Sequence, residues 1–217
     1  MPRIARIVAE GYPHHIIQRG NNRQAVFFDD EDKRFYLKLV KKYSRDCGSK
    51  VHAYCLMDNH VHMLFTPQRD NSLAKTMQKL SLRFTQHINR KYKRTGRLWE
   101  CRFHSSLVDK ESYLWSVCRY IERNPVRAKI VNKASQYEWS SANETHKSDI
   151  IESIWDETQR REYIDYLNME EDKEQIQIIR KHTYSGKPIG SAGFINHIAK
   201  ILKLDLNTKP KGRPKKT

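Results

Sequence analysis

Polar and apolar residues alternate with two different periods along the first 131 residues, and each change of period marks a change of element. Residues 14–19 and 98–108 have the alternation and the β-branched and aromatic content of strands. Residues 51–66 contain two apolar runs around Met57-Asp58-Asn59, a turn sequence, and therefore predict a β-hairpin. Gly20-Asn21-Asn22 ends the first strand.

Three stretches have helical spacing instead. The first is predicted to run to about Asp46, with Asp29 and Asp30 as possible caps and Gly48 after its end. The second follows Asn71-Ser72 and stops before Gly96. The third is predicted over 110–124, because Asp109 can cap it and a proline follows it.

The resulting order, β-α-β-β-α-β and then a helix, is that of a ferredoxin-like split βαβ unit. We therefore expect an α+β fold in which an antiparallel sheet carries helices on one face. The other face stays free for a ligand or for one more helix. The last predicted helix, over 110–124, is the candidate for that position.

The C-terminal third divides by composition. Residues 1–131 form the predicted core, and 132–149 is a polar connecting segment anchored by Tyr137 and Trp139. Residues 150–206 predict a small helical extension, with helices at 157–168, 170–182 and 194–204. Residues 207–217 form a basic tail with the composition of a disordered segment.

Charge narrows the possible partners. Lys and Arg number 41 against 25 Asp and Glu, which gives a formal net charge of +16 over 217 residues. A polyanion is the expected partner, although a basic protein can also be merely soluble. No apolar run is long enough to span a membrane, and residues 1–13 lack the apolar centre of a signal peptide, so we expect a cytoplasmic protein. The four cysteines have no Cys-x-x-Cys spacing and are expected to be reduced and mostly buried.

The second strand of the hairpin opens with His60-Val61-His62. Alternate residues of a strand share a face, so the two imidazoles point the same way. Such a pair can hold a metal, or it can be two ordinary half-buried histidines. Tyr120 and Asn124, four residues apart on the last predicted helix, share one face of that helix at the edge of its apolar stripe. Each of them has an ordinary packing or helix-ending role as an alternative.

Taken together, these residues resemble the HUH-type single-tyrosine transposases, and specifically the REP-associated tyrosine transposases. The resemblance covers roughly residues 12–131 and rests on five short stretches: Gln18-Arg19-Gly20-Asn21, Met57-Asp58-Asn59-His60, His60-Val61-His62, Gly96-Arg97-Leu98-Trp99, and residues 120–128, YIERNPVRA. It implies cleavage and rejoining of single-stranded DNA beside hairpins. It also implies that His60, His62 and Asn124 bind Mg²⁺ or Mn²⁺ and that Tyr120 is the nucleophile.

The expected partner is therefore single-stranded and hairpin DNA, bound by a monomer or a homodimer away from membranes. We expect DNA contacts from cationic side chains in three places. Arg19 and Arg23 flank the first turn, while Lys75, Lys79 and Arg83 are spaced four apart on the second helix, where a merely solvated face is the alternative. Lys211 and Arg213 lie in a tail segment that resembles an AT-hook, a minor-groove binder, although its usual first arginine is a lysine here.

Three other interpretations remain at this point. The protein could bind hairpin DNA as a regulator without cutting it. It could bind RNA on its sheet, with Tyr54 and Phe65 as the candidate stacking residues. A zinc site is the third and is disfavoured because no cysteine has ligand spacing.

Overall fold

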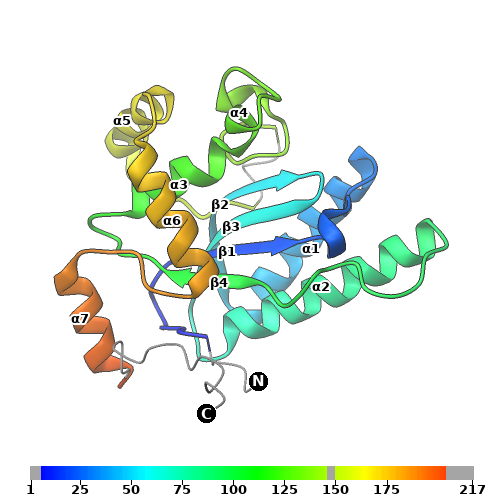
Figure 1. Ribbon diagram of the computed structural model, residues 1–217, viewed down its shortest axis with the longest axis horizontal. Helices are drawn as coiled ribbons and strands as arrows, with labels where there is room; N and C mark the ends of the chain where they lie inside the picture. The colour runs from blue at the N-terminus through cyan, green and yellow to red at the C-terminus, as the bar shows by residue number, and fades with distance from the viewer. Residues whose placement is uncertain (1–5, 146–149, 204–217) are drawn as a thin grey trace, which may run out of the picture.

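The computed structural model describes residues 6–145 and 150–203. Its centre is a four-stranded antiparallel sheet in the order β2-β3-β1-β4 (Figure 1). The strands are β1 (His14–Arg19), β2 (Ser49–Met57), β3 (His60–Pro67) and β4 (His104–Leu107). This is the strand order of a ferredoxin-like unit, so the predicted α+β class and the predicted hairpin are confirmed.

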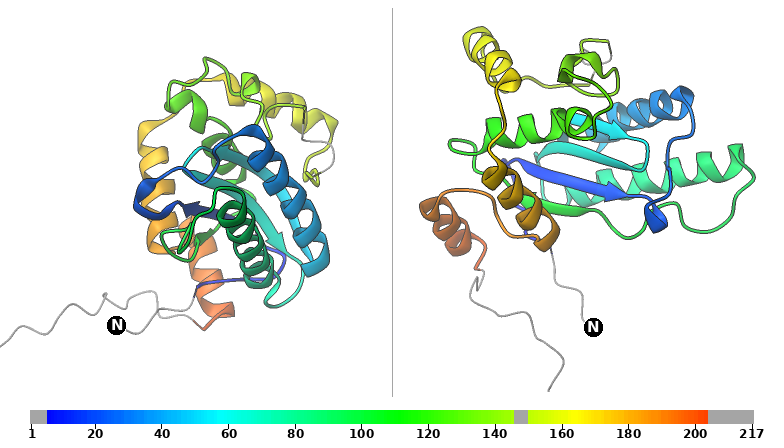
Figure 2. Two further views of the ribbon diagram at one scale, coloured as in Figure 1. Left: turned by 90° about the vertical axis from the view of Figure 1, so that its right-hand side faces the viewer. Right: turned by 45° about the horizontal axis from the view of Figure 1, so that its top comes forward.

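Helices α1 (Asp30–Cys47) and α2 (Ser72–Lys91) cover one face of the sheet (Figure 2). The cap of α1 is the predicted one, because the Asp29 carboxylate accepts a hydrogen bond from the Asp32 N–H. Gly48 ends α1 with φ of 74°, a left-handed conformation that glycine adopts without strain. The apolar stripe of α2 packs into the main core together with the alternate residues of β3 that face it.

The second face is covered by two helices. Helix α3 (Leu114–Glu122) packs on β2 and β3, and α6 (Lys173–Ser185) packs on β1 and β4 (Figures 1 and 2). The sequence predicts only one helix here. The predicted extension therefore contributes to the layer that covers the sheet, through α6, while α5 (Glu157–Asn168) and α7 (Ala192–Ile201) flank it.

Two predicted elements are longer than those observed. The strand predicted over 98–108 is regular only in β4, because the described residues 98–103 form one isolated bridge, between Trp99 and Gly20, and no continuous ladder with the sheet. The helix predicted over 110–124 begins at Leu114, because the Asp109 carboxylate holds a separate turn through Glu111 N–H and the Ser112 hydroxyl.

The chain also remains helical beyond Pro125. A new short helix, α4 (Asn124–Arg127), starts there, since proline lacks an N–H and fits the first turn of a helix. Helix α2 ends at Lys91, short of Gly96, and α6 is displaced by three residues from its predicted range. Two 3₁₀ turns, Asn21–Arg23 and Ala134–Gln136, complete the regular structure of the described part.

Both edges of the sheet are covered by irregular segments. Residues 137–141 run along β2, where Leu56 and Trp139 share a backbone hydrogen bond and Ser140 bridges Cys55. Tyr137 and Trp139 are buried, as predicted for anchors of this segment. Ile189 binds the end of β4 through backbone hydrogen bonds to Leu107 and Asp109. Covered edges protect a sheet from pairing with another chain.

Cys47, Cys55 and Cys118 are buried, Cys101 is exposed, and all four are free thiols. Among the described residues, no helix has the length and apolar content needed to cross a bilayer.

Candidate active site

Three aromatic side chains meet where β3 begins and α3 ends. The His60 and His62 rings, on one face of β3, have centroids 5.1 Å apart. The Tyr120 ring of α3 stands edge-on to His62, with 5.6 Å between centroids, and is 4 % exposed. The structure thus brings two of the predicted ligands and the predicted nucleophile together from elements about 60 residues apart in the chain.

His60 lies at the rim of this cluster. It is paired across the strands with Arg19, and its Nδ1 lies 2.6 Å from Oδ1 of Asn59. Because the amide oxygen can only accept, His60 donates from Nδ1 and leaves Nε2 with a free lone pair. Burial and, after it, the nearby Arg19 lower the pKa of His60 to about 4.

His62 is buried more deeply. Its Nδ1 lies 3.0 Å from Nε2 of His15, and the two rings stack with centroids 5.3 Å apart. Burial, reinforced by the neighbouring histidines and arginines, holds the pKa of His62 well below its usual value. Both histidines are therefore neutral at neutral pH, the form in which imidazole binds a metal.

Asn124 lies one turn after Tyr120, at the start of α4. Its amide nitrogen donates to the carbonyl oxygens of Tyr120 and Ile121, at 3.0 Å each, an orientation assigned from this hydrogen bonding. Its Oδ1 accepts no hydrogen bond within the described ranges, and this oxygen is the atom that could bind a cation. The side-chain hydrogen bonds of Asn124 go to the last turn of α3 and not to either histidine.

These donors suit a divalent ion. Two neutral imidazoles and one amide oxygen can hold Mg²⁺ or Mn²⁺ while leaving open positions for phosphate oxygens. Across residues 6–145 and 150–203, no group of three or more His, Cys, Asp or Glu could hold a metal. The candidate site therefore depends on an amide as its third donor.

Arg127 is a neighbour of Tyr120 that the sequence indicates only as part of the resembling stretch. Its guanidinium lies 4.4 Å from the centre of the Tyr120 ring and donates to the Tyr120 carbonyl oxygen. It also pairs with Glu171 at 2.5 Å, and Glu171 pairs with Arg123 at 3.2 Å. The break between α3 and α4, where Tyr120 and Asn124 lie, is thus fixed by a carboxylate from the loop before α6.

Arg19 and Arg23, the predicted DNA contacts of the first turn, lie beside the start of β3. Their turn is fastened to the hairpin turn by a hydrogen bond from Gly20 N–H to the Asn59 carbonyl, and by another from the Asn59 amide to the Arg23 carbonyl. A side chain at Gly20 would meet the Gln24 carbonyl oxygen at 2.2 Å, so only glycine fits there. Arg23 is exposed, and Arg19 is partly buried with its guanidinium 6.0 Å from the Tyr184 ring.

The remaining predicted DNA contacts lie elsewhere. Lys75, Lys79 and Arg83 are exposed on α2, in the layer on the opposite side of the sheet from Tyr120. Lys211 and Arg213 lie outside the described residues. The structure therefore brings Arg19 and Arg23 to the candidate site and leaves the α2 side chains on a separate surface.

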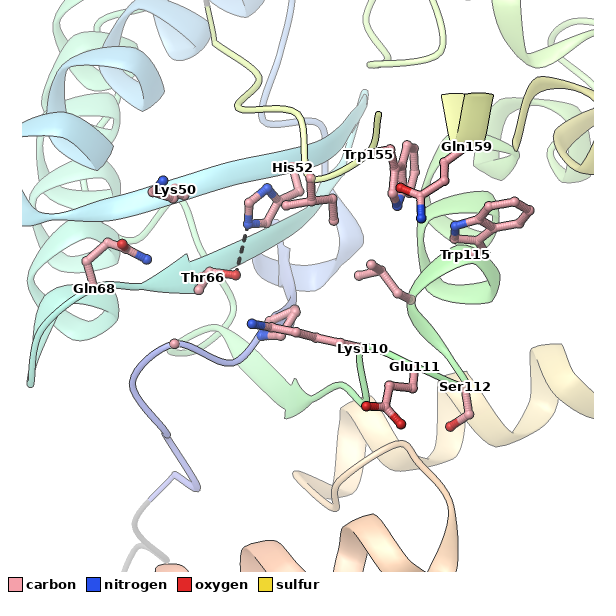
Figure 3. A pocket seen from close by; sticks show the side chains of 14 residues that line it. Lys50, His52, Thr66, Gln68, Lys110, Glu111, Ser112, Trp115, Trp155 and Gln159 are labelled. Atoms are coloured by element: carbon pink, nitrogen blue, oxygen red, sulfur yellow. Dashed lines mark hydrogen bonds between the residues drawn. The ribbon is translucent and has the colours of Figure 1, made fainter. Parts of the chain in front are cut away.

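A cavity of about 910 Å³ opens near the far end of β3 (Figure 3). His52 and Thr66, which share a hydrogen bond of 2.9 Å, line its floor, and Trp115 and Trp155 line one side. None of the predicted catalytic or metal-binding residues lines this cavity.

The aromatic side chains proposed for RNA stacking are core residues. Tyr54 and Phe65 are both 0 % exposed, so neither can stack on a base. That observation removes the sequence feature on which the RNA-binding interpretation rested.

Comparison with known proteins identifies the family of this chain. The profile of the family described as "Transposase IS200 like" matches residues 9–124, more than half of the chain. A Haemophilus influenzae protein assigned to the REP-associated tyrosine transposases is 26% identical over 114 residues, which are 48% of this chain and 64% of that protein. The match thus spans less than two thirds of this relative.

The fold also has a solved counterpart. The structure of a REP-associated tyrosine transposase bound to a REP hairpin superposes with a TM-score of 0.57 at 18% identity, covering 65% of this chain and 82% of that one. At this identity the likeness concerns the fold. The family match includes the first strand, the His60-Val61-His62 strand, helix α3 and Asn124, which follows α3. The chain therefore belongs to the IS200-like transposase family.

Proposed function

We propose that this protein cleaves and rejoins single-stranded DNA beside hairpins during DNA transposition, with Tyr120 as the nucleophile and a divalent metal bound by His60, His62 and Asn124. The observation that carries the proposal is the packing of the Tyr120 ring edge-on against His62, next to the neutral pair formed by the half-buried His60 and the buried His62. Family membership supports the reaction class, and the hairpin bound to the structural relative supports the substrate class.

The chemistry would be a displacement at phosphorus. The Tyr120 oxygen attacks a backbone phosphate, the bond between phosphorus and the 3′ oxygen breaks, and that oxygen leaves with a proton as a 3′-hydroxyl. The product is a 5′-phosphotyrosine ester. Because the ester bond energy is kept, attack by another 3′-hydroxyl reverses the step and joins new ends.

The side chains divide the work. A bound Mg²⁺ or Mn²⁺ would polarise the phosphate and offset the charge that develops in the transition state. Arg127, packed on the Tyr120 ring and backbone, holds the nucleophile in place. Arg19 and Arg23, fastened beside His60, are the cations best placed to hold the phosphates on either side of the cut.

Single strands fit this arrangement. The nucleophile and the histidines are buried or half-buried between a sheet and a helix, so a phosphate reaches them only if its strand can bend into the site. An unpaired strand is flexible enough to do so. The stem of the hairpin would stay outside, where cationic side chains can contact its phosphates.

The test is covalent trapping. Incubated with Mn²⁺ and an oligonucleotide that carries a hairpin and an unpaired flank labelled on the 3′ side of the cut, the wild-type protein should give a labelled adduct on a denaturing gel. Tyr120→Phe removes the attacking oxygen and should reduce the adduct at least 10³-fold while DNA binding is kept. Tyr184→Phe, an exposed tyrosine beside Arg19, is the matched control and should retain the adduct.

A non-catalytic regulator of hairpin elements is the second candidate. Binding of the hairpin without any adduct, across Mg²⁺, Mn²⁺ and other divalent ions, would favour it over the enzyme.

A further inference from the structure

A chain of buried hydrogen bonds connects the proposed metal ligand His62 to helix α6. Nδ1 of His62 lies 3.0 Å from Nε2 of His15, and Nδ1 of His15 lies 2.8 Å from the Thr183 hydroxyl. The hydroxyl in turn lies 2.7 Å from the Ile179 carbonyl oxygen. His15 and Thr183 are both 0 % exposed, and they lie 168 residues apart.

The donors and acceptors in this series of hydrogen bonds follow from the Ile179 carbonyl oxygen at its end. A carbonyl oxygen can only accept, so at 2.7 Å the Thr183 hydroxyl must donate its one proton to Ile179. Thr183 then accepts from His15, which must carry its proton on Nδ1. Nε2 of His15 is left as an acceptor, and only His62 can supply the proton between the two rings.

Both rings carry one proton each in this arrangement. A second proton would place a positive charge in the core, and within the described part of the molecule neither ring contacts a carboxylate that could offset it. His62 is therefore protonated at Nδ1 and unprotonated at Nε2.

We propose that Thr183 and His15 are positioning residues that hold His62 in the tautomer whose Nε2 can bind the metal. This gives helix α6, beyond the part of the chain that the family profile covers, a defined role in the active site. The inference rests on the proposed function for the identity of the metal site. The hydrogen-bond polarity itself is independent of DNA cleavage.

Removing the Thr183 hydroxyl should reverse the tautomer preference of His15 and His62. In Thr183→Val the Nδ1–H of His15 loses its acceptor, and an unsatisfied buried donor is costly, so His15 is driven to the other tautomer. Its Nε2–H would then face His62, whose own proton must move to Nε2, the metal-binding position. Partners that orient a metal-binding histidine typically contribute about 10- to 100-fold in metal affinity.

The first readout is the tautomer in the metal-free protein. Long-range ¹H–¹⁵N spectra of imidazole-labelled wild-type protein should show His62 protonated at Nδ1, and Thr183→Val should lose that state. A wild-type spectrum with the proton on Nε2 of His62 would overturn the inference. The wild-type spectrum alone is decisive and requires neither a folded variant nor DNA.

The second readout is Mn²⁺ binding by calorimetry. Thr183→Val should raise the Kd about 10- to 100-fold, Thr183→Ser should restore it, and His15→Gln, which keeps an acceptor for His62, should bind Mn²⁺ more tightly than His15→Leu. Thr76→Val is the matched control, because Thr76 is equally buried and its hydroxyl also donates to the carbonyl four residues earlier, on helix α2. It should leave the Kd unchanged.

The outcomes separate the two proposals. If the wild-type protein binds Mn²⁺ and Thr183→Val binds it equally well, the positioning role is wrong while the metal site stands. The same conclusion follows if Thr183→Val and Thr76→Val weaken binding equally. If the wild-type protein binds no Mn²⁺, the proposed metal site is wrong and the role of Thr183 in metal binding falls with it.

Discussion

The adjacent residues His14 and His15 of β1 lie in different environments, because consecutive residues of a strand face opposite sides of the sheet. His15 faces the candidate site. His14 faces the N-terminal segment, where its Nε2 accepts from the Ala9 N–H at 3.2 Å and its Nδ1 donates to the Tyr12 carbonyl oxygen at 2.8 Å. Its ring is 0 % exposed, so a second proton would be both buried and in conflict with the Ala9 N–H.

His14 should therefore make the fold sensitive to acid. Burial lowers its pKa from 6.5 to about 4 in the folded state. Between pH 4 and pH 6.5 His14 binds a proton in the unfolded chain but not in the folded chain. The contribution of neutral His14 to the free energy of unfolding is therefore fully present above about pH 6.5 and falls as the pH drops toward 4. A shift of this size corresponds to roughly 3 kcal/mol.

The measurement is urea unfolding at several pH values. His14→Gln should be less stable than wild type at pH 7 but should lose less free energy of unfolding between pH 7 and pH 4.5, by about 1–3 kcal/mol. Equal pH slopes in the two proteins would contradict this account. The other buried histidines contribute to the slope in both proteins and cancel in the comparison.

At the scale of elements, the C-terminal helices are fastened to α3 by polar contacts inside the fold. The buried Glu122 carboxylate accepts from the Tyr163 hydroxyl of α5 and from the Ser141 hydroxyl, at 2.6 Å each. Glu171, in the loop between α5 and α6, pairs with Arg123 and Arg127. Because these contacts surround the residues next to Tyr120, the extension and the candidate site are expected to respond together to mutation.

Tyr163→Phe tests one of these contacts. It removes the hydroxyl that donates to the buried Glu122 carboxylate, and it should lower the free energy of unfolding by about 1–3 kcal/mol. Tyr36→Phe is the control, because the Tyr36 hydroxyl is buried and has no hydrogen-bond partner in the part of the chain that the structure describes. Chemical denaturation should show Tyr36→Phe within about 0.5 kcal/mol of wild type. Equal losses in the two variants would show that the Glu122 contact contributes nothing specific.

Sequence patterns predicted most of the helices and strands but not which of them pack together. Period and capping residues located β1, the hairpin and α1 because those signals are local. The strand predicted over 98–108 is longer than the observed β4, since apolar residues such as Leu98 and Phe103 are buried without pairing in a ladder. Pro125 indicated a helix end at Asn124, whereas α3 ends at Glu122 and the proline lies in the first turn of α4, because its missing N–H suits that position.

The candidate site was predictable to the extent that its residues share a face. Spacing alone placed His60 beside His62 and Tyr120 one turn before Asn124. The roles of His15 and Thr183 could not be predicted, because period two tells which way a side chain points and not which helix, more than 160 residues later, packs over it. Thr183 lies in a stretch for which the sequence offered no mechanism.

At the scale of the whole molecule, the predicted DNA-binding cations among the described residues lie on two separate surfaces. Arg19 and Arg23 lie at the candidate site, and Lys75, Lys79 and Arg83 lie on the exposed side of α2, across the sheet. A hairpin whose unpaired flank enters the site could reach α2 only around an edge of the molecule. The α2 residues therefore remain a prediction for contacts with the stem.

Salt dependence tests that prediction. Each phosphate contact contributes about 0.7 to 0.9 to the slope of log affinity against log salt, so replacing Lys75, Lys79 and Arg83 together by Gln should reduce the slope by about 2 to 3. Adduct formation with saturating DNA should persist, since these residues lie far from Tyr120. An unchanged slope would mean that the α2 side chains form a solvated surface.

The central claim is that Tyr120 becomes covalently attached to DNA. Its most direct test is peptide mass spectrometry after wild-type protein has reacted with a hairpin oligonucleotide and Mn²⁺ and has been digested with nuclease and protease. If Tyr120 is the nucleophile, a nucleotide 5′-phosphate should be found on the peptide that contains Tyr120. It should be missing when Mn²⁺ is omitted. A nucleotide on any other residue, or cleaved DNA with no protein adduct, would contradict it.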